Sequence, residues 1–545
     1  MKRKTTIPSR FALAWAFALL VASSISLSAQ FAFTTNNSAI TITGYTGPGG
    51  VVTVPPTING LQVVEIGAYA FDSAAALTSI TIPDGVTSIN TYAFQYCSSL
   101  ASVRVGQGMK SIGFGAFFEC RNLTNVTLPD SVTSFDTYAF RGCSSLASLV
   151  IPSNLTAIAN SVFFEAGLTN VSIPRSVTSI GSGAFHPCAK LQVITVDALN
   201  PVYSSLDGVL LNKGQTLLIQ CPGGKRGNYS PPQSVVSIGE SSFSYCGELT
   251  GVTLGTNLTA IPNQAFFSCR KLSDFTIPDR VTAIGTSVFA YCSGLTNVTL
   301  GKAVSSVGSR AFASCVQLQG FSVSPLNPNL SSVEGVLFNK SATRLLSYPG
   351  GKPGSYTIPA SVTNIAANAF ESSSKLAGVV IPPSVKSIPD YAFAFCTNLT
   401  SVTIPRTVSS LGDRAFVACS GLASVYFSGN TPALLSSYVF YGANKAILYY
   451  LSGTLGWTPS FGGRPTMLWN PTPQSGDGSF GVHANRFGFN ISGTTNIPVV
   501  IEAATTLDSP VWIQLQSCKL TNGSIYFSDP TWTNYPTRFY RIRSP

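Results

Sequence analysis

The chain has 545 residues, of which 45% are apolar, 10% are charged and two are histidine. A charged fraction so far below the usual quarter predicts a surface of Ser, Thr, Asn and Gly, which suits an exported protein better than a cytosolic enzyme. The formal net charge is +11. The Lys and Arg residues are scattered and are not interleaved with aromatic residues, so we expect no nucleic-acid partner.

Residues 1–29 have the pattern of a secretory signal peptide. Residues 1–10 are basic and residues 11–22 are apolar, and small polar residues follow, so we expect cleavage near Ser28–Ala29. Loss of the four cations of this leader leaves a net charge of about +7. The apolar stretch is short for a membrane span, and an uncleaved anchor is the alternative. We expect a secreted or cell-surface protein without a membrane span in its mature form.

Residues 30–57 are expected to form an N-terminal cap, and a 23-residue repeat occupies residues 58–447. Each copy is marked by a Phe, usually preceded by Ala and followed three residues later by Cys. The marker Phe stands at Phe71, Phe94, Phe117, Phe140, Phe163, Phe185, Phe243, Phe266, Phe289, Phe312, Phe370, Phe393, Phe416 and Phe440. A fixed period of this length is typical of a solenoid, here of about fourteen units.

Within one copy the spacing of the apolar residues changes. Phe94 and Cys97 are three residues apart, which predicts a short helical or 3-10 turn. Val103 and Val105 alternate with outward residues, which predicts a short strand. A Pro often ends this strand, as at Pro129. One copy buries too few side chains to offset the entropy of ordering its backbone, so the copies are expected to stack.

Two segments carry a resemblance to a known family. Tyr92–Leu100 (YAFQYCSSL) and Val126–Phe135 (VTLPDSVTSF), with their counterparts in the other copies, resemble the BspA-type leucine-rich repeat of bacterial surface and secreted proteins. The resemblance covers about residues 58–440. It implies a leucine-rich-repeat solenoid that acts in adhesion or protein interaction, whereas the spacing alone predicts only a solenoid.

The spacing of the marker Phe widens to 58 residues twice, which places inserts near residues 197–231 and 324–358. The inserts are copies of each other, offset by 127 residues. Apolar runs on both sides of an Asn-Lys pair predict a β-hairpin that projects from the solenoid or widens it. Each insert ends in Gly-Gly-Lys without the remaining spacing of a phosphate-binding loop. We interpret this triplet as a turn with a solvated Lys.

The end of the chain departs from the repeat. Residues 448–470 are expected to close the exposed core as a C-terminal cap, and residues 471–478, rich in Pro, Gly and Ser, are expected to be a linker. Residues 479–545 read as short strands and resemble a small all-β module found at the ends of bacterial exported proteins. Attachment or export is our hypothesis for its role.

The sequence holds no recurring arrangement of catalytic residues. His186 occupies a variable position next to a marker Phe, and His483 lies in the C-terminal module, so neither suggests an active site. Ten Cys share the third position after the marker Phe, where Ala and Ser also occur. We interpret this position as a small buried slot, although stacked copies would bring the Cys within disulfide range. We expect no enzyme, metal or cofactor.

The outward position of each repeat strand, about ten residues after the marker Phe, is the candidate ligand-binding face. We name it the outward stripe; its members are Thr81, Arg104, Thr127, Thr195, Thr253, Thr276, Thr299, Ser322, Thr403 and Tyr426. The stripe is either a recognition face for a protein or a glycan or simply a solvated surface, since Thr is a good strand residue. A purely structural surface component is the alternative function, and an enzyme is a remote one.

Overall fold

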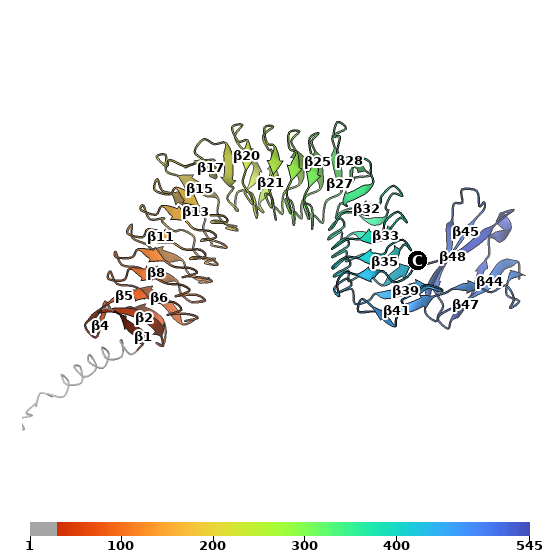
Figure 1. The fold of residues 1–545 in the computed structure, drawn as a ribbon, viewed down its shortest axis with the longest axis horizontal. Coiled ribbons are helices and arrows are strands. Elements are labelled where there is room, and N and C mark those ends of the chain that lie inside the picture. The colour runs from red at the N-terminus through yellow and green to blue at the C-terminus, as the bar shows by residue number, and fades with distance from the viewer. Residues whose placement is uncertain (1–29, 37, 545) are drawn as a thin grey trace, which may run out of the picture. The chain divides into compact units, whose positions relative to one another are not determined.

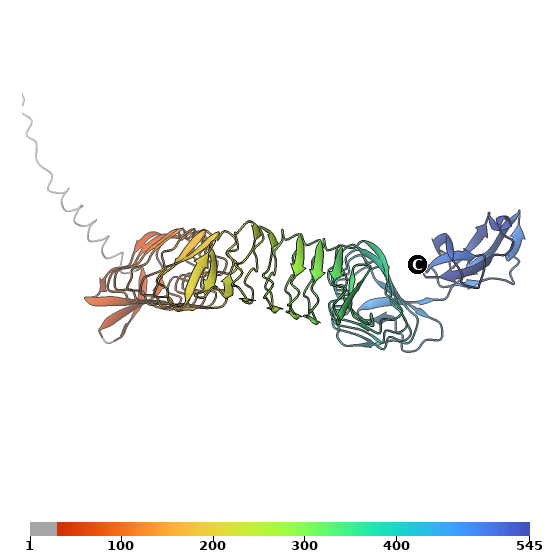
Figure 2. The same cartoon turned by 90° about the horizontal axis from the view of Figure 1, so that it is seen from above.

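The computed structural model describes residues 30–36 and 38–544. The expected signal peptide lies outside the described residues. The chain divides between Leu272 and Ser273 into two compact units, each described here by itself. Both units contain stacked coils of short strands, and the second also contains the all-β module (Figure 1). Figure 2 shows the coils as loops that surround a common interior within each unit.

In the first unit the longer strands of successive coils pair in parallel. They are β3 (Gly50–Thr53), β6 (Leu77–Thr81), β8 (Ser102–Arg104), β10 (Asn125–Thr127), β13 (Asn170–Ile173), β15 (Val193–Val196), β19 (Gly227–Tyr229) and β21 (Leu249–Val252). Two-residue strands form a second column: β7 (Ser88–Ile89), β9 (Ser111–Ile112), β11 (Ser134–Phe135), β12 (Ala157–Ile158), β14 (Ser179–Ile180), β20 (Ser237–Ile238) and β22 (Ala260–Ile261). The second column continues at its N-terminal end into β1 (Phe31–Asn36), β2 (Ala39–Tyr45), β4 (Thr57–Ile58) and β5 (Leu61–Ile66).

The second unit repeats this arrangement. Its longer strands are β23 (Asp274–Ile277), β25 (Asn297–Leu300), β27 (Gly320–Val323), β31 (Gly354–Thr357), β33 (Leu376–Val380), β35 (Ser401–Ile404), β37 (Ser424–Phe427), β39 (Ile447–Leu451) and β41 (Arg464–Trp469). Its two-residue strands are β24 (Ala283–Ile284), β26 (Ser306–Val307), β32 (Asn364–Ile365), β34 (Ser387–Ile388), β36 (Ser410–Leu411) and β38 (Ala433–Leu434). β40 (Ser460–Phe461) pairs with β41 in the antiparallel sense.

The turn around each marker Phe differs from the expected helical or 3-10 turn. Around Phe94, the amides of Gln95 and Cys97 donate to the carbonyls three residues earlier. Tyr92 and Tyr96, two residues before and after Phe94, have left-handed backbone with φ of 53° and 56°. A left-handed residue cannot continue a right-handed helix, so the loop is a series of tight turns. Among the described residues the sole helix is the 3-10 helix η1 (Trp532–Asn534).

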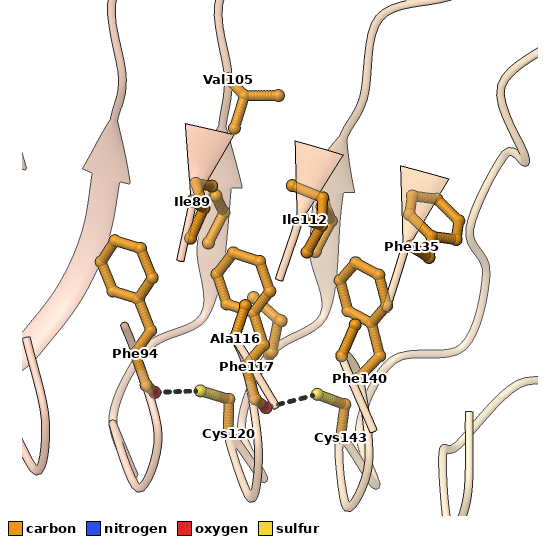
Figure 3. Packing of buried hydrophobic residues seen from close by; sticks show 14 of the residues in the cluster. Ile89, Phe94, Val105, Ile112, Ala116, Phe117, Cys120, Phe135, Phe140 and Cys143 are labelled. Atoms are coloured by element: carbon orange, nitrogen blue, oxygen red, sulfur yellow. Dashed lines mark hydrogen bonds between the residues drawn. The ribbon is translucent and has the colours of Figure 1, made fainter. Parts of the chain in front are cut away.

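The marker Phe residues of successive coils stack on one another in the core, in runs such as Phe71 to Phe185 and Phe370 to Phe440. Phe117 lies between Phe94 and Phe140, with ring centroids 5.2 and 5.4 Å away and nearly parallel planes (Figure 3). The thiol of Cys120 donates to the carbonyl oxygen of Phe94 at 2.9 Å, and that of Cys143 donates to Phe117 at 3.2 Å. The Cys side chains therefore point at backbone carbonyls of the preceding coil. All twelve Cys are free.

Each insert is an antiparallel meander of three strands, and its first two strands form the β-hairpin that the sequence predicted. The strands are β16 (Tyr203–Leu206), β17 (Val209–Asn212) and β18 (Leu217–Gln220) in the first insert, and β28 (Leu330–Val333), β29 (Val336–Asn339) and β30 (Arg344–Ser347) in the second. Asp207 and Gly208 have φ of 51° and 77°, the left-handed pair that a two-residue hairpin turn requires. The last strand of each meander rejoins the solenoid, since β18 pairs with β20 and β30 with β32 in parallel.

The C-terminal module contains two small sheets. One holds β42 (Thr472–Pro473), β43 (Gly481–His483), β44 (Arg486–Ser492) and β47 (Ser524–Asp529), and the other holds β45 (Pro498–Ala504), β46 (Ile513–Lys519) and β48 (Phe539–Arg543). The segment expected as a linker, residues 471–478, carries β42, which pairs with β44. Asp477 in the same segment accepts a hydrogen bond from Asn490 at 2.8 Å. Part of the expected linker is thus bonded to the module.

Candidate interaction surface

The outward stripe lies on the longer strands, where side chains alternate between core and solvent. On β10, Val126 is buried while Asn125 and Thr127 are exposed, because successive strand residues point to opposite faces. Seven stripe members are exposed in the same way: Arg104, Thr127, Thr195, Thr253, Thr276, Thr299 and Ser322. Thr81 and Thr403 are half-buried. The stripe thus presents short polar side chains over most of its members.

Parallel pairing brings stripe members side by side in two runs. In the first unit Thr81, Arg104 and Thr127 occupy directly paired positions on β6, β8 and β10. In the second unit Thr276, Thr299 and Ser322 are paired on β23, β25 and β27. Neighbouring paired strands lie about 4.8 Å apart, so each run is a closely spaced row.

Tyr426 corrects the sequence expectation of an exposed position. It faces outward on β37, but only 5% of its surface is exposed, because it belongs to an apolar cluster with residues of the C-terminal module. Its ring stacks on that of Tyr449 at 5.0 Å, and Trp469 lies beside it at 6.3 Å. The indole N–H of Trp469 donates to the carbonyl of Pro498 at 2.9 Å. Burial raises the pKa of the Tyr426 hydroxyl, and the stripe ends before this residue.

Two exposed valines share the geometry of the stripe and were missed because only polar members were selected. Val150 follows Leu149 at the outward position of its coil and is 81% exposed. Val380 is the partner of Thr403 on the neighbouring strand and is 55% exposed. Counting ten residues from Phe140 and Phe370 would have found both. The outward surface therefore mixes hydroxyl and apolar contacts.

An aromatic ridge follows the turns of the first unit and was also missed. Its members stand two residues before, or one or two residues after, the marker Phe: Tyr69, Tyr92, Tyr96, Phe118, Tyr138 and Phe164. Tyr69 stacks on Tyr92 at 5.6 Å and is 51% exposed. The guanidinium of Arg141 lies 5.3 Å from the Phe118 ring and 4.7 Å from the Phe164 ring, within cation–π range. The spacing around the marker Phe is the signal that would have identified the ridge.

The two histidines considered for chemistry differ in burial. His186 is buried, and desolvation lowers its pKa, while His483 lies on exposed β43 of the other unit. Among the residues that the structure describes, no group of three His, Cys, Asp or Glu side chains could hold a metal ion.

The Lys of each Gly-Gly-Lys triplet is held within its own insert. The ammonium of Lys225 donates to the carbonyl of Asp207 at 2.7 Å and lies 5.0 Å from the Tyr229 ring. Lys352 makes the corresponding bond to Glu334 and lies 5.9 Å from the Tyr356 ring. Both Lys are half-buried, which corrects the expectation of a solvated Lys. The triplet fastens the end of the insert to its hairpin turn.

The fold agrees with a known family of repeats. Residues 64–192, 227–343 and 352–450 match the model of the BspA type leucine rich repeat region, in six copies. Because the match covers more than half of the chain, the protein belongs to this family. The comparison with curated proteins gave no match. Among the described residues no helix is long and apolar enough to cross a membrane.

Several solved structures resemble the chain. A leucine-rich repeat protein from Eubacterium ventriosum is 24% identical, with 72% of this chain and 93% of that chain covered and a TM-score of 0.49. A leucine rich cell surface protein from Faecalibacterium prausnitzii is 28% identical, with 68% and 92% covered and a TM-score of 0.45. The pneumococcal vaccine antigen PcpA is 18% identical, with 81% and 96% covered and a TM-score of 0.39. The family assignment rests on the repeat match alone.

Proposed function

We propose that the protein is an exported, non-enzymatic interaction protein that acts at the cell surface and binds a protein or a glycan through the outward stripe. The observation that carries the proposal is the row of exposed short side chains at paired positions, such as Thr276, Thr299 and Ser322. Solenoids offer extended surfaces of this kind for recognition. Export is supported by the signal-peptide pattern of residues 1–29.

The stripe has the chemistry of a surface that makes many weak contacts. Thr and Ser hydroxyls both donate and accept hydrogen bonds, and the exposed valines add apolar contacts. The buried residues that precede stripe members on the same strands, Val298 and Phe321 for example, pack in the core and hold the strands in place. A partner would therefore meet a rigid row with little side-chain entropy to lose, because Thr, Ser and Val have few rotatable bonds.

The experiment begins with the mature protein, residues 30–545, on arrays of glycans and of extracellular proteins. The ligand with the highest signal is then titrated against the wild type and the variant Thr276→Glu with Ser322→Glu. The two carboxylates lie two strands, or about 10 Å, apart, so repulsion between them is screened. We expect at least a tenfold loss of affinity with an unchanged melting curve. Failure of every array ligand to bind would favour the purely structural alternative.

A further inference from the structure

The second insert interrupts the stacking of the turns. In an ordinary pair of coils the amide of the marker Phe donates to the Ala carbonyl of the next turn, as from Phe289 to Ala311 at 2.8 Å. Side chains instead bridge the turns that precede and follow the second insert. The hydroxyl of Ser309 donates to Asn368 at 2.9 Å, and the guanidinium of Arg310 lies 2.5 Å from the carboxylate of Glu371.

A cavity of about 420 Å³ opens beside these bridges. Its size falls within the range of small-molecule sites. The lining includes Ser309, Arg310, Asn329, Arg344, Ser347 and Glu371. Hydroxyl, amide and guanidinium groups thus converge on one volume, which suits a ligand rich in hydrogen-bonding groups.

The charges of the cavity leave one cation in excess. The Glu371 side chain is 1% exposed, and its oxygens accept from Arg310 and from the Asn368 amide. Burial raises the pKa of Glu371 and Arg310 opposes that rise. The Nε–H of Arg310 is buried without a hydrogen-bond acceptor. Among the described residues no carboxylate pairs with Arg344. A carboxylate ligand would therefore meet two guanidinium groups and a single protein carboxylate, that of Glu371, which is already paired with Arg310.

The first insert provides a natural comparison, because its residues are offset by 127. Arg310 corresponds to Gly183, Arg344 to Leu217 and Glu371 to Ser244. Ala313 corresponds to His186, a buried ring that packs against Tyr245 at a centroid distance of 5.5 Å. The corresponding positions in and beside the first insert therefore lack these charged groups, and the meander shared by both inserts does not require them.

We propose that the cavity beside the second insert binds the acidic sugar unit of a carbohydrate, with the carboxylate at Arg310 and Arg344 and the hydroxyls at Ser309, Ser347 and Asn329. The site is separate from the outward stripe, so it goes beyond the proposed function. Either proposal can fail without the other.

Isothermal titration of the mature protein with glucuronate, glucose and acetate tests the site. We expect glucuronate to bind at least tenfold more tightly than glucose, which lacks the carboxylate, and than acetate, which lacks the hydroxyls. Absence of saturable glucuronate binding, or equal binding of acetate, would overturn the proposal. A hyaluronan oligosaccharide, which contains glucuronate in a chain, forms a second arm. If the oligosaccharide binds more tightly than glucuronate, the natural ligand is a sugar unit within a polymer. If the two bind equally, the natural ligand is a free sugar acid.

Two variants locate the binding. Ala313→His copies the residue that occupies this position in the first insert. Arg310→Gln with Glu371→Gln removes the charged pair together, so that no buried charge is left alone. Both are expected to weaken glucuronate binding at least tenfold with a preserved melting curve. Arg414→Gln, which removes a turn guanidinium from an ordinary coil, is the matched control and is expected to bind normally. Unchanged affinity in Ala313→His would overturn the assignment.

Discussion

At the scale of the residue, the recurring Cys completes the hydrogen bonding of the core. The Phe94 carbonyl accepts the amide of Cys97 within its own turn and the thiol of Cys120 from the next coil. A carbonyl has two lone pairs, and a small side chain with a weak donor fits the slot that Ala166 and Ser373 fill elsewhere. Burial also raises the pKa of the thiols, to about 12 for Cys188 and for Cys419.

These raised pKa values predict a loss of stability at alkaline pH. An unfolded thiol ionises near its ordinary pKa of 9.0, whereas the folded thiol of Cys188 or Cys419 ionises near 12. The contribution of each thiol is therefore fully present below about pH 9 and is lost as the pH rises toward 12, with a slope of up to about 1.4 kcal/mol per pH unit. Urea unfolding at pH 8 and pH 10.5 measures the loss. The variant Cys188→Ala with Cys419→Ala is expected to lose less over this interval, and an equal loss would contradict the account.

At the scale of the element, the turn of most coils holds a left-handed residue two positions before and two positions after the marker Phe. Left-handed backbone costs a residue with a side chain roughly 1–2 kcal/mol. Ala418, two residues after Phe416, has a φ of 55°. Stacking of the Phe rings and the bonds between turns hold such residues in place, and Gly142 occupies the same position of another coil.

We predict that Ala418→Gly stabilises the protein by about 0.5–1 kcal/mol, because relief of the left-handed strain exceeds the entropy gained by the unfolded chain. The matched control is Ala394→Gly. Ala394 follows Phe393 directly, is buried, and is not left-handed, so Gly there is expected to destabilise. Free energies of unfolding from urea titrations measure both changes. A change in the free energy of unfolding with the same sign in both variants would contradict the explanation.

The sequence predicted the elements better than their details. The period of the marker Phe gave the coils, and the alternation of Val103 with its neighbours gave the strands. The turn was predicted wrongly because an i, i+3 spacing is shared by a 3-10 helix and by a series of tight turns. The burial of Tyr426 depends on the C-terminal module, which lies far along the sequence. The cavity depends on residues before, within and after the second insert, which the fold brings together. Neither leaves a signal in the local sequence.

At the scale of the whole molecule, stability comes from contacts between neighbouring coils, as in other solenoids. Strands β37 and β39 of the solenoid depart from this rule, since Tyr426 and Tyr449 are covered through the cluster they share with the module. The stripe ends at Thr403, and the corresponding outward positions of the next two strands hold Tyr426 and Tyr449. The C-terminal module therefore protects an apolar end of the strand face.

Truncation of the module tests this role. A fragment of residues 30–478 is expected to retain the strand signal of the solenoid in circular dichroism. It is expected to bind the apolar dye ANS more strongly than the whole protein, because Tyr426 and Tyr449 become accessible. In the variant Tyr426→Ser with Tyr449→Ser the extra dye binding should fall. A fragment with unchanged dye binding would show that the module does not cover these rings. An unfolded fragment would show that the module is part of the solenoid cap.

The most direct test of the account is the affinity of the array-selected ligand for two matched variants. Thr276→Glu with Ser322→Glu alters the outward stripe. Thr363→Glu with Ser409→Glu places the same two charges on exposed positions next to the two-residue strands of the second unit. The account predicts a dissociation constant at least tenfold larger for the stripe variant, and a change in dissociation constant of less than about twofold for its control. Equal affinity of both variants for the ligand would contradict it.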